Sequence, residues 1–161
     1  MTGVQTCALP ISLSLSSPPV EILAIDVQPL SAGLFRAPEA VLLAKPESPN
    51  GLEQWRRFLQ TNGVTALIPG SDHDLPPLAS VRDKWASTGV CQTLVSDLEL
   101  VQACRDKAAT CQMLEQEGLP FPRSVWDVSV DEAVCWARSN GSPVVIKPRE
   151  GHGSRGRHLN T

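Results

Sequence analysis

Short apolar runs alternate with helical stripes in the first part of the chain, and this alternation constrains the fold most. Runs of strand length occur at residues 21–27, 64–68 and 90–95. Residues 52–59 place their apolar side chains at helical spacing, and residues 75–88 carry two prolines in the first turn of a predicted helix. Strands that alternate with helices across short Gly/Pro turns indicate an α/β fold with a parallel sheet.

Composition sets the class of protein but not its partner. The hydrophobic fraction of 42% over 161 residues is sufficient for a globular core, and the net charge of −3 favours neither nucleic acid nor a membrane surface as a partner. No apolar stretch has the length of a membrane span. The cysteines form no metal-binding or redox pair, which is typical of a cytoplasmic protein.

The charge is divided unevenly along the chain. Before Arg138 there are 9 basic residues against 16 acidic ones, and from Arg138 onward there are 5 basic residues against 1 acidic one. An acidic body with a basic end indicates either that the end meets an anion or that it is a solvated tail.

The first residues are unlike the rest of the chain. Residues 1–11, Met1 to Ile11, read like the translation of a sequencing adapter, and we expect them to be an artefact of assembly. A signal peptide is the weaker alternative, because no Lys or Arg precedes Arg36 and Pro10 interrupts the apolar run. Residues 12–20 are rich in Ser and Pro, and we expect a disordered lead there.

A helical region is predicted over residues 96–118, where apolar residues recur every three or four positions. Asp106 can cap a second helix inside it and leaves Lys107 in the first turn. A lysine there opposes the helix dipole, so it has either another role or a simple exposed position. Residues 119–122 read as an extended linker, followed by a strand at 124–128 and a helix at 130–140.

The last segment carries the candidate chemistry. A predicted strand at 143–147 ends in Lys147 and leads into a loop in which Gly151, Gly153 and Gly156 match G-x-G-x-x-G. Residues 157–159 look like a strand rather than a helix, and no Lys follows the glycines, which disfavours the dinucleotide fingerprint and the P-loop. A strand–loop–strand flap can cover a polyphosphate, with Arg149 or Arg155 adding forked contacts. An ordinary hairpin tip is the alternative.

Four segments together resemble the ATP-grasp superfamily, and within it the carbamoyl-phosphate-synthase-like and amino-acid-ligase-like members. They are Ile68 to Leu75 (IPGSDHDL), Asp106-Lys107, Gly118 to Pro122 (GLPFP), and Pro143 to Gly156 (PVVIKPREGHGSRG). The resemblance runs from residue 21 to the end of the chain.

The resemblance implies a Rossmann-like parallel sheet over residues 21–95, the pre-ATP-grasp domain. A connecting helical region would follow over 96–118, and the start of the α+β ATP-grasp subdomain over 119–161. It implies that ATP and Mg²⁺ are cofactors and that a small carboxylate is activated as an acylphosphate for attack by an amine or similar nucleophile. The implied cofactor-binding residues are Lys107, Lys147, Arg149, Gly151, Gly153, Ser154, Arg155 and Gly156.

Asp72 and Asp74 follow a predicted strand and either border the cleft for the carboxylate or cap the next helix. The catalytic and metal-binding residues of the family are expected beyond Thr161, so we expect the chain to act as an inactive fragment that binds ATP weakly or not at all. A dinucleotide-binding oxidoreductase and a non-catalytic nucleotide-binding module are the alternative functions. A homo-oligomer is left open.

Overall fold

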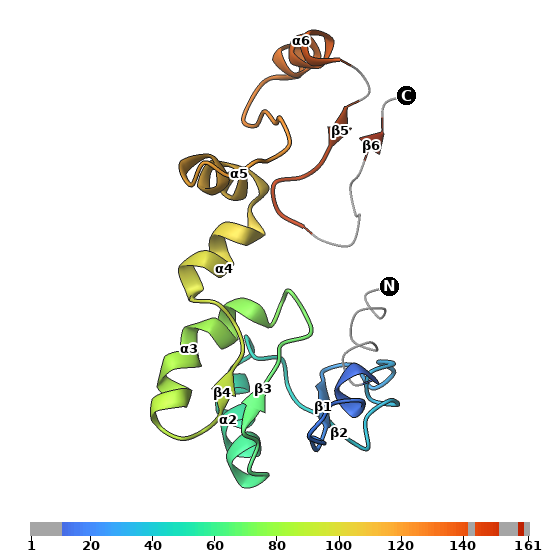
Figure 1. Ribbon diagram of the computed structural model, residues 1–161, viewed down its shortest axis with the longest axis vertical. Coiled ribbons are helices and arrows are strands. Elements are labelled where there is room, and N and C mark those ends of the chain that lie inside the picture. The colour runs from blue at the N-terminus through green and yellow to red at the C-terminus, as the bar shows by residue number, and fades with distance from the viewer. Residues whose placement is uncertain (1–10, 142–143, 152–157, 160–161) are drawn as a thin grey trace. The chain divides into compact units, whose positions relative to one another are not determined.

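The computed structural model describes residues 11–141, 144–151 and 158–159, and it divides into two compact units (Figure 1). The first unit comprises Met1–Leu98 and the second comprises Glu99–Thr161. Residues 1–10 of the adapter-like stretch 1–11 lie outside the described residues, and Ile11 lies within them. Each unit is described by itself.

The first unit begins with two parallel strands. β1 (Leu23–Asp26) pairs with β2 (Glu39–Leu42), with Leu23 opposite Glu39 and Asp26 opposite Leu42. β1 was predicted, whereas β2 lies in a segment whose sequence reads as loop. Three of the four β2 residues are exposed, so β2 lacks the alternating apolar pattern that marks a strand.

A second parallel pair follows, joined by a helix. β3 (Ala66–Leu67) and β4 (Gln92–Thr93) pair in parallel, and α3 (Leu75–Ser87) connects them. α2 (Gly51–Thr61) precedes β3. β3, α3 and β4 lie within the predicted segments, and α2 extends one residue before and two residues after the predicted stripe at 52–59. Pro76 and Pro77 occupy the start of α3, where their missing N–H groups cost no helical hydrogen bond.

The core of this unit lies where both helices meet the strands. Trp55 and Leu59 from α2 pack with Leu78 and Trp85 from α3, and Leu59 and Leu78 are fully buried. The Trp55 indole Nε1 donates a hydrogen bond to the Ala44 carbonyl at 2.8 Å, so its polar end is satisfied as well. The remaining buried members are Leu43, Leu67, Val90 and Cys91.

The first unit is therefore an α/β structure with parallel strand pairs. Among the described residues the four strands form two separate pairs rather than one continuous sheet. The small parallel sheets agree with the predicted fold class. The Rossmann-like strand order stays a prediction.

The second unit contains two consecutive helices, a separate helix and a strand pair. α4 (Leu98–Arg105) starts at the last residue of the first unit, α5 (Lys107–Gln116) follows at once, and α6 (Val130–Asn140) comes after an irregular segment. β5 (Val145–Ile146) pairs antiparallel with β6 (His158–Leu159). The predicted helix at 130–140 has the same bounds as α6, which starts at a capping box made by Ser129 and Glu132.

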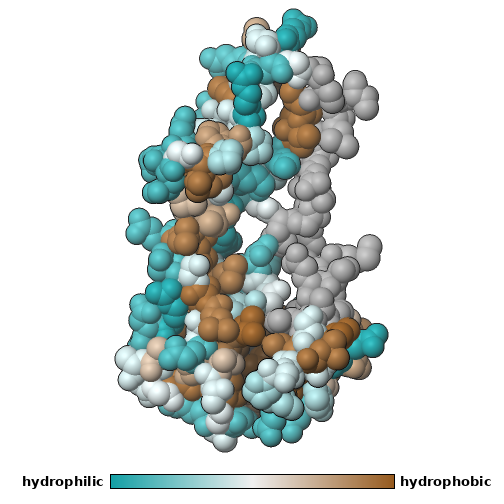
Figure 2. Space-filling view, in the orientation of Figure 1, coloured by the Kyte–Doolittle hydropathy of each residue, from teal (hydrophilic) through white to brown (hydrophobic). Residues whose placement is uncertain are grey.

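Apolar side chains of the second unit are largely exposed, as the brown surface of its elements shows (Figure 2). Its buried apolar residues are Val101 and Ala108 among those described, whereas Val130 is 80% exposed and Ile146 is 52% exposed. Polar contacts also join its segments, since Lys107 and Asp106 both bond to Arg149.

Two segments differ from the expectation. Residues 11–14 are helical and lie at the edge of the stretch expected to be a disordered lead, and the Ser14 hydroxyl donates to the Ile11 carbonyl at 2.7 Å. Residues 124–128 were predicted as a strand, and this prediction was wrong. Asp127 has a φ of 57°, in the left-handed region, which no regular strand contains.

Candidate functional site

The candidate site is built around the start of α5. Asp106 is the N-cap of this helix, and its Oδ1 accepts hydrogen bonds from the amides of Ala108 at 2.8 Å and Ala109 at 3.4 Å. A side-chain oxygen at this position satisfies amides that have no partner inside the helix. The predicted second cap at Asp106 is confirmed.

Lys107, the first residue of α5, contacts the glycine-rich loop from 42 to 44 positions along the chain. Its backbone amide donates to the Arg149 carbonyl at 3.0 Å. Its ammonium Nζ donates to the carbonyls of Arg149 at 3.2 Å and Gly151 at 3.1 Å. The lysine that opposes the helix dipole therefore has a specific role, which is to hold the start of the loop.

Arg149 joins two acidic residues that come from different segments. Its Nε donates to both carboxylate oxygens of Asp106 at 3.1 Å, and its Nη2 also contacts Oδ2 of that carboxylate. Its Nη1 donates to Asp127 Oδ2 at 2.7 Å. Hydrogen bonding to Arg149 lowers the pKa of Asp106, and the two carboxylates together raise the pKa of Arg149.

Asp127 has no counterpart among the residues singled out in the sequence. It lies 22 positions before Arg149 and adopts a left-handed backbone that Asp tolerates better than most residues. Neither its spacing nor its neighbours mark it as a partner of the loop. No sequence pattern predicts that an Asp will adopt left-handed backbone angles at this position, so the structure is needed to find it.

The glycine-rich loop is framed by β5 and β6. Val145 pairs with Leu159 and Ile146 pairs with His158, so the chain continues as an antiparallel strand after the loop. This confirms strands on both sides of the loop. Gly151 has a φ of 124°, a backbone conformation that residues with a Cβ rarely adopt. Gly153, Ser154, Arg155 and Gly156 lie outside the described residues.

Lys147 directly follows β5 and is exposed. Within the described ranges its ammonium has neither an ion pair nor a hydrogen bond. Lys107 and Lys147 both belong to the start of the loop. Lys107 bonds to the carbonyls of residues 149 and 151, and these residues come just after Lys147 in the chain. Their charges suit an anionic group such as a phosphate.

Asp72 and Asp74 belong to the first unit, in the connection from β3 to α3. Asp74 is the N-cap residue of α3, but its side chain makes no capping hydrogen bond. Burial raises the pKa of its carboxyl to about 6, with smaller contributions from Glu47 and Asp26. The capping alternative for Asp74 therefore finds no support in its side-chain contacts, and its role as a substrate residue stays a prediction.

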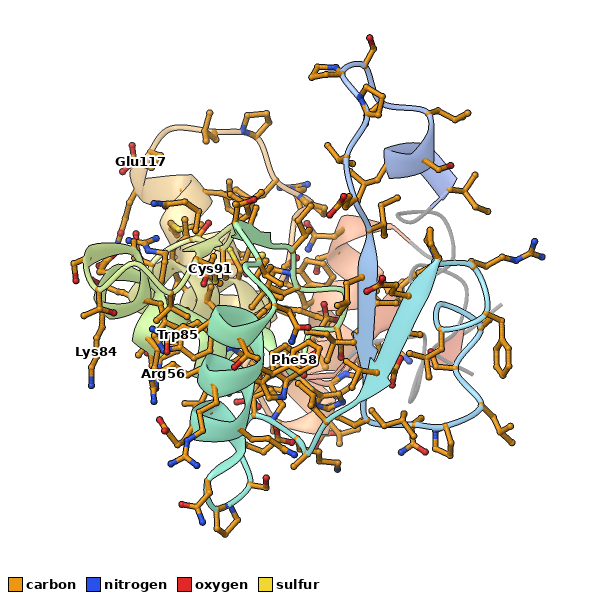
Figure 3. All side chains as sticks on the ribbon, turned by 90° about the horizontal axis from the view of Figure 1, so that it is seen from below. Arg56, Phe58, Lys84, Trp85, Cys91 and Glu117 are labelled. Atoms are coloured by element: carbon orange, nitrogen blue, oxygen red, sulfur yellow. The ribbon has the colours of Figure 1, made fainter. Side chains whose placement is uncertain are left out.

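A concave surface lies between α2 and α3, apart from the residues singled out in the sequence. It is a shallow groove of about 430 Å³ whose lining includes Arg56, Lys84 and Trp85, which Figure 3 labels. The Arg56 guanidinium is already hydrogen-bonded within α2. Its Nε and Nη2 donate to the Glu53 carboxylate at 2.7 Å, and its Nη1 donates to the Gln60 side-chain oxygen. The sequence did not predict this groove, because its lining combines one face from each of two helices.

The donor set suits a phosphate better than a metal ion. In the part of the chain that the structure describes, no group of three or more His, Cys, Asp or Glu side chains is placed to hold a metal. Lysine ammonium groups and loop amides are the donors that polyphosphates use in proteins.

None of the described helices has the length and apolar character to cross a membrane.

Part of this chain is similar in sequence to a curated protein. No family model matches the sequence. A curated relative, the uncharacterized protein y4rH of Sinorhizobium fredii, is 32% identical over 111 residues, which cover 63% of this chain and 23% of that protein. The chain thus spans less than a quarter of the length of this relative.

Two solved structures are similar over most of the chain. The biotin carboxylase domain of the Hydrogenobacter thermophilus 2-oxoglutarate carboxylase, a dimer solved with MgADP, ADP and bicarbonate, has a TM-score of 0.58 and 20% identity. The match covers 96% of this chain and 35% of that chain. The biotin carboxylase domain of a single-chain bacterial carboxylase has a TM-score of 0.54 and 19% identity, over 88% of this chain and 34% of that chain.

Biotin carboxylase domains have the ATP-grasp fold, and this chain spans about a third of the length of each of the two. Identities of 19% and 20% carry an argument about fold and nothing finer. The described chain therefore has an α/β structure similar to part of an ATP-grasp domain.

Proposed function

We propose that this chain is the nucleotide-binding portion of an ATP-grasp ligase, which activates a carboxylate as an acylphosphate for attack by an amine or similar nucleophile. The observation that carries the proposal is the contact between Lys107 and the loop. The Lys107 ammonium lies at 3.1 Å from the Gly151 carbonyl, at the start of a loop framed by antiparallel strands. The likeness to biotin carboxylase domains supports it at the level of fold.

In this proposal Lys107 and Lys147 hold the phosphates of ATP. Two positive charges next to a moving phosphoryl group stabilise the negative charge that it carries in the transition state. Gly151, Gly153, Ser154 and Gly156 would follow the phosphates closely with their backbone, with Arg155 beside them. Bound Mg²⁺ would neutralise phosphate charge.

The domain assignment belongs to the same proposal. Residues 21–95 would form the pre-ATP-grasp domain, 96–118 the connecting helical region, and 119–161 the start of the ATP-grasp subdomain. Asp72 and Asp74 would border the cleft for a small carboxylate. A cytoplasmic location and assembly as a homo-oligomer complete the proposal.

The pairing of β5 with β6 separates this function from the oxidoreductase alternative. A dinucleotide-binding loop opens a helix whose N-terminus receives the pyrophosphate. Here residues 158–159, after the glycines, pair as a strand with β5. A non-catalytic nucleotide-binding module would share every feature of the site and differs only in turnover.

Trapping of an acylphosphate tests the proposal in the full-length protein that contains this chain. The protein is incubated with MgATP, hydroxylamine and a panel of small carboxylates, and the hydroxamate and ADP are measured. We expect carboxylate-dependent hydroxamate, abolished by Lys147→Met and retained by Lys84→Met, a matched change in the α2–α3 groove. ATP binding without hydroxamate for any carboxylate would favour the non-catalytic module, and the absence of both would contradict the proposal.

A further inference from the structure

We propose that Arg149 is a positioning residue that fixes the start of the glycine-rich loop on α5, and that it does not itself bind phosphate. The inference rests on the proposed function, because it divides the labour among the cations of that phosphate site. It changes the role that the sequence suggests for Arg149, which was a forked contact to the nucleotide.

The charge of Arg149 is already matched inside the protein. One guanidinium faces two carboxylates, with Nε at 3.1 Å from both oxygens of Asp106 and Nη1 at 2.7 Å from Asp127. The three side chains together carry a net charge of −1 when the acids are ionised, and the pKa of Asp106 is lowered by this contact. A phosphate at Arg149 would meet this net negative charge and would have to share the guanidinium with two carboxylates.

The backbone of Arg149 is held at the same place as its side chain. The Arg149 carbonyl accepts from the Lys107 amide at 3.0 Å and from the Lys107 ammonium at 3.2 Å. Asp106 and Lys107 are neighbours in sequence, so two consecutive residues grip residue 149 by its side chain and by its main chain. Such a clamp sets both the position and the direction in which the chain continues toward Gly151.

Asp127 extends the clamp to a third segment. Its φ of 57° is a conformation that is costly for most residues and persists where surrounding contacts determine it. The ion pair with Arg149 Nη1 is such a contact. Arg149 thereby joins the start of α5, the segment before α6 and the end of β5 around the ammonium of Lys107.

The two roles of Arg149 predict opposite effects of Asp127→Asn. Asn keeps the tolerance for a left-handed backbone and removes only the charge. If Arg149 positions the loop, losing this partner loosens the clamp and weakens MgATP binding. If Arg149 binds phosphate, losing a competing carboxylate frees the guanidinium and strengthens MgATP binding. Asp131→Asn in the first turn of α6 is the matched control for the change in net charge.

The experiment measures amide exchange and nucleotide affinity on the same samples of the 161-residue chain. Exchange of the Lys107 amide reports the clamp directly, because this amide donates to the Arg149 carbonyl. We expect Arg149→Gln and Asp127→Asn each to accelerate this exchange by roughly three- to tenfold, and the double variant to add little to Arg149→Gln alone. Arg149→Lys, which keeps one charge but not the fork, should restore only part of the protection.

The MgATP titration then decides between the two roles by its sign. We expect a dissociation constant that rises by about threefold or more in Asp127→Asn relative to Asp131→Asn. A tighter complex in Asp127→Asn, or unchanged exchange of the Lys107 amide in both Arg149→Gln and Asp127→Asn, would overturn the positioning role. If the unsubstituted 161-residue chain shows no MgATP binding, the titration is repeated with the full-length protein. No binding there contradicts the proposed function, and the exchange data alone still decide whether Arg149 positions the loop.

Discussion

The ammonium of Lys107 donates a hydrogen bond to the carbonyl oxygen of Gly151 at 3.1 Å, across 44 positions of sequence. The same ammonium donates to the Arg149 carbonyl, so two of its three N–H groups are directed at the loop. One cation on the first turn of a helix thus holds the start of a glycine-rich segment at residues 149 and 151.

Replacement of Lys107 should weaken nucleotide binding more than its exposure suggests. Lys107→Gln removes the cation and at the same time releases the carbonyls of residues 149 and 151. We expect the dissociation constant for MgATP to rise by about tenfold or more, as for the loss of a charge-assisted contact. Calorimetric titration measures this, with Lys84→Gln as the control. Equal affinities in the two variants would contradict a role for Lys107 in the site.

Gly151 should tolerate substitution worse than Gly118, although both have positive φ. Gly118 at 65° is in the left-handed region that Asn adopts, whereas Gly151 at 124° is not. We expect Gly151→Asn to lower the free energy of unfolding by about 1–3 kcal/mol and Gly118→Asn by a few tenths. A Cβ at Gly151 would meet Pro148 Cγ at 3.7 Å, an ordinary contact, so the cost comes from the backbone. Urea denaturation of both variants provides the comparison, and equal losses would be inconsistent with this backbone assignment.

Asp74 should make stability fall as the pH rises through mildly acidic values. Its folded-state pKa of about 6 lies above the ordinary value of 3.8, so between these values the folded chain holds more protons than the unfolded chain. The destabilisation is absent below about pH 4, complete above about pH 6, and amounts to roughly 1–2 kcal/mol once partial solvent exposure is allowed for.

Asp74→Asn should therefore raise the free energy of unfolding at pH 7 and leave it little changed at pH 4. The N-cap geometry offers no competing loss, because the Asp74 side chain makes no capping hydrogen bond. Thermal unfolding across this pH range checks the effect, with exposed Asp72→Asn as the matched control. A stabilisation of Asp74→Asn that is the same at both pH values would show that burial of the charge is not its cause.

The core of the first unit should depend on Leu59 and Leu78, which come from α2 and α3. We expect Leu59→Ala or Leu78→Ala to cost about 2–5 kcal/mol of unfolding free energy, because a fully buried side chain leaves a cavity. Leu30→Ala, at a residue that is 87% exposed, should change it by less than about 0.5 kcal/mol. Similar values for all three would refute the packing of the two helices.

Local signals in the sequence were sufficient for most of the helices. α6 has the predicted bounds because Ser129 and Glu132 cap its start and Gly141, with a φ of 84°, follows its end. Asp106 marks the start of α5 in the same local way. β2 was missed because its strand character comes from its partner β1 and not from its own pattern of burial.

The sequence predicted those residues of the site that are unusual for their local position in the chain. Lys107 stood out because a lysine is unfavourable in the first turn of a helix, and Gly151 stood out within the glycine-rich loop. The ion pair of Arg149 with Asp127 was not predictable, because it depends on a left-handed residue in a segment that reads as a strand. Contacts of this kind depend on tertiary structure alone.

We propose that nucleotide phosphates bind where Lys107 meets the loop, and the chemical shifts of the backbone amides report such binding residue by residue. The 161-residue chain labelled with ¹⁵N is titrated with MgATP into the millimolar range, where weak binding is still detected. We expect saturable shifts at the amides of Lys107 and Gly151 that are lost in Lys107→Gln, with the amide of Gly63 in the first unit unchanged. Shifts confined to the α2–α3 groove around Arg56 and Lys84, or no shifts at Lys107 and Gly151, would contradict it.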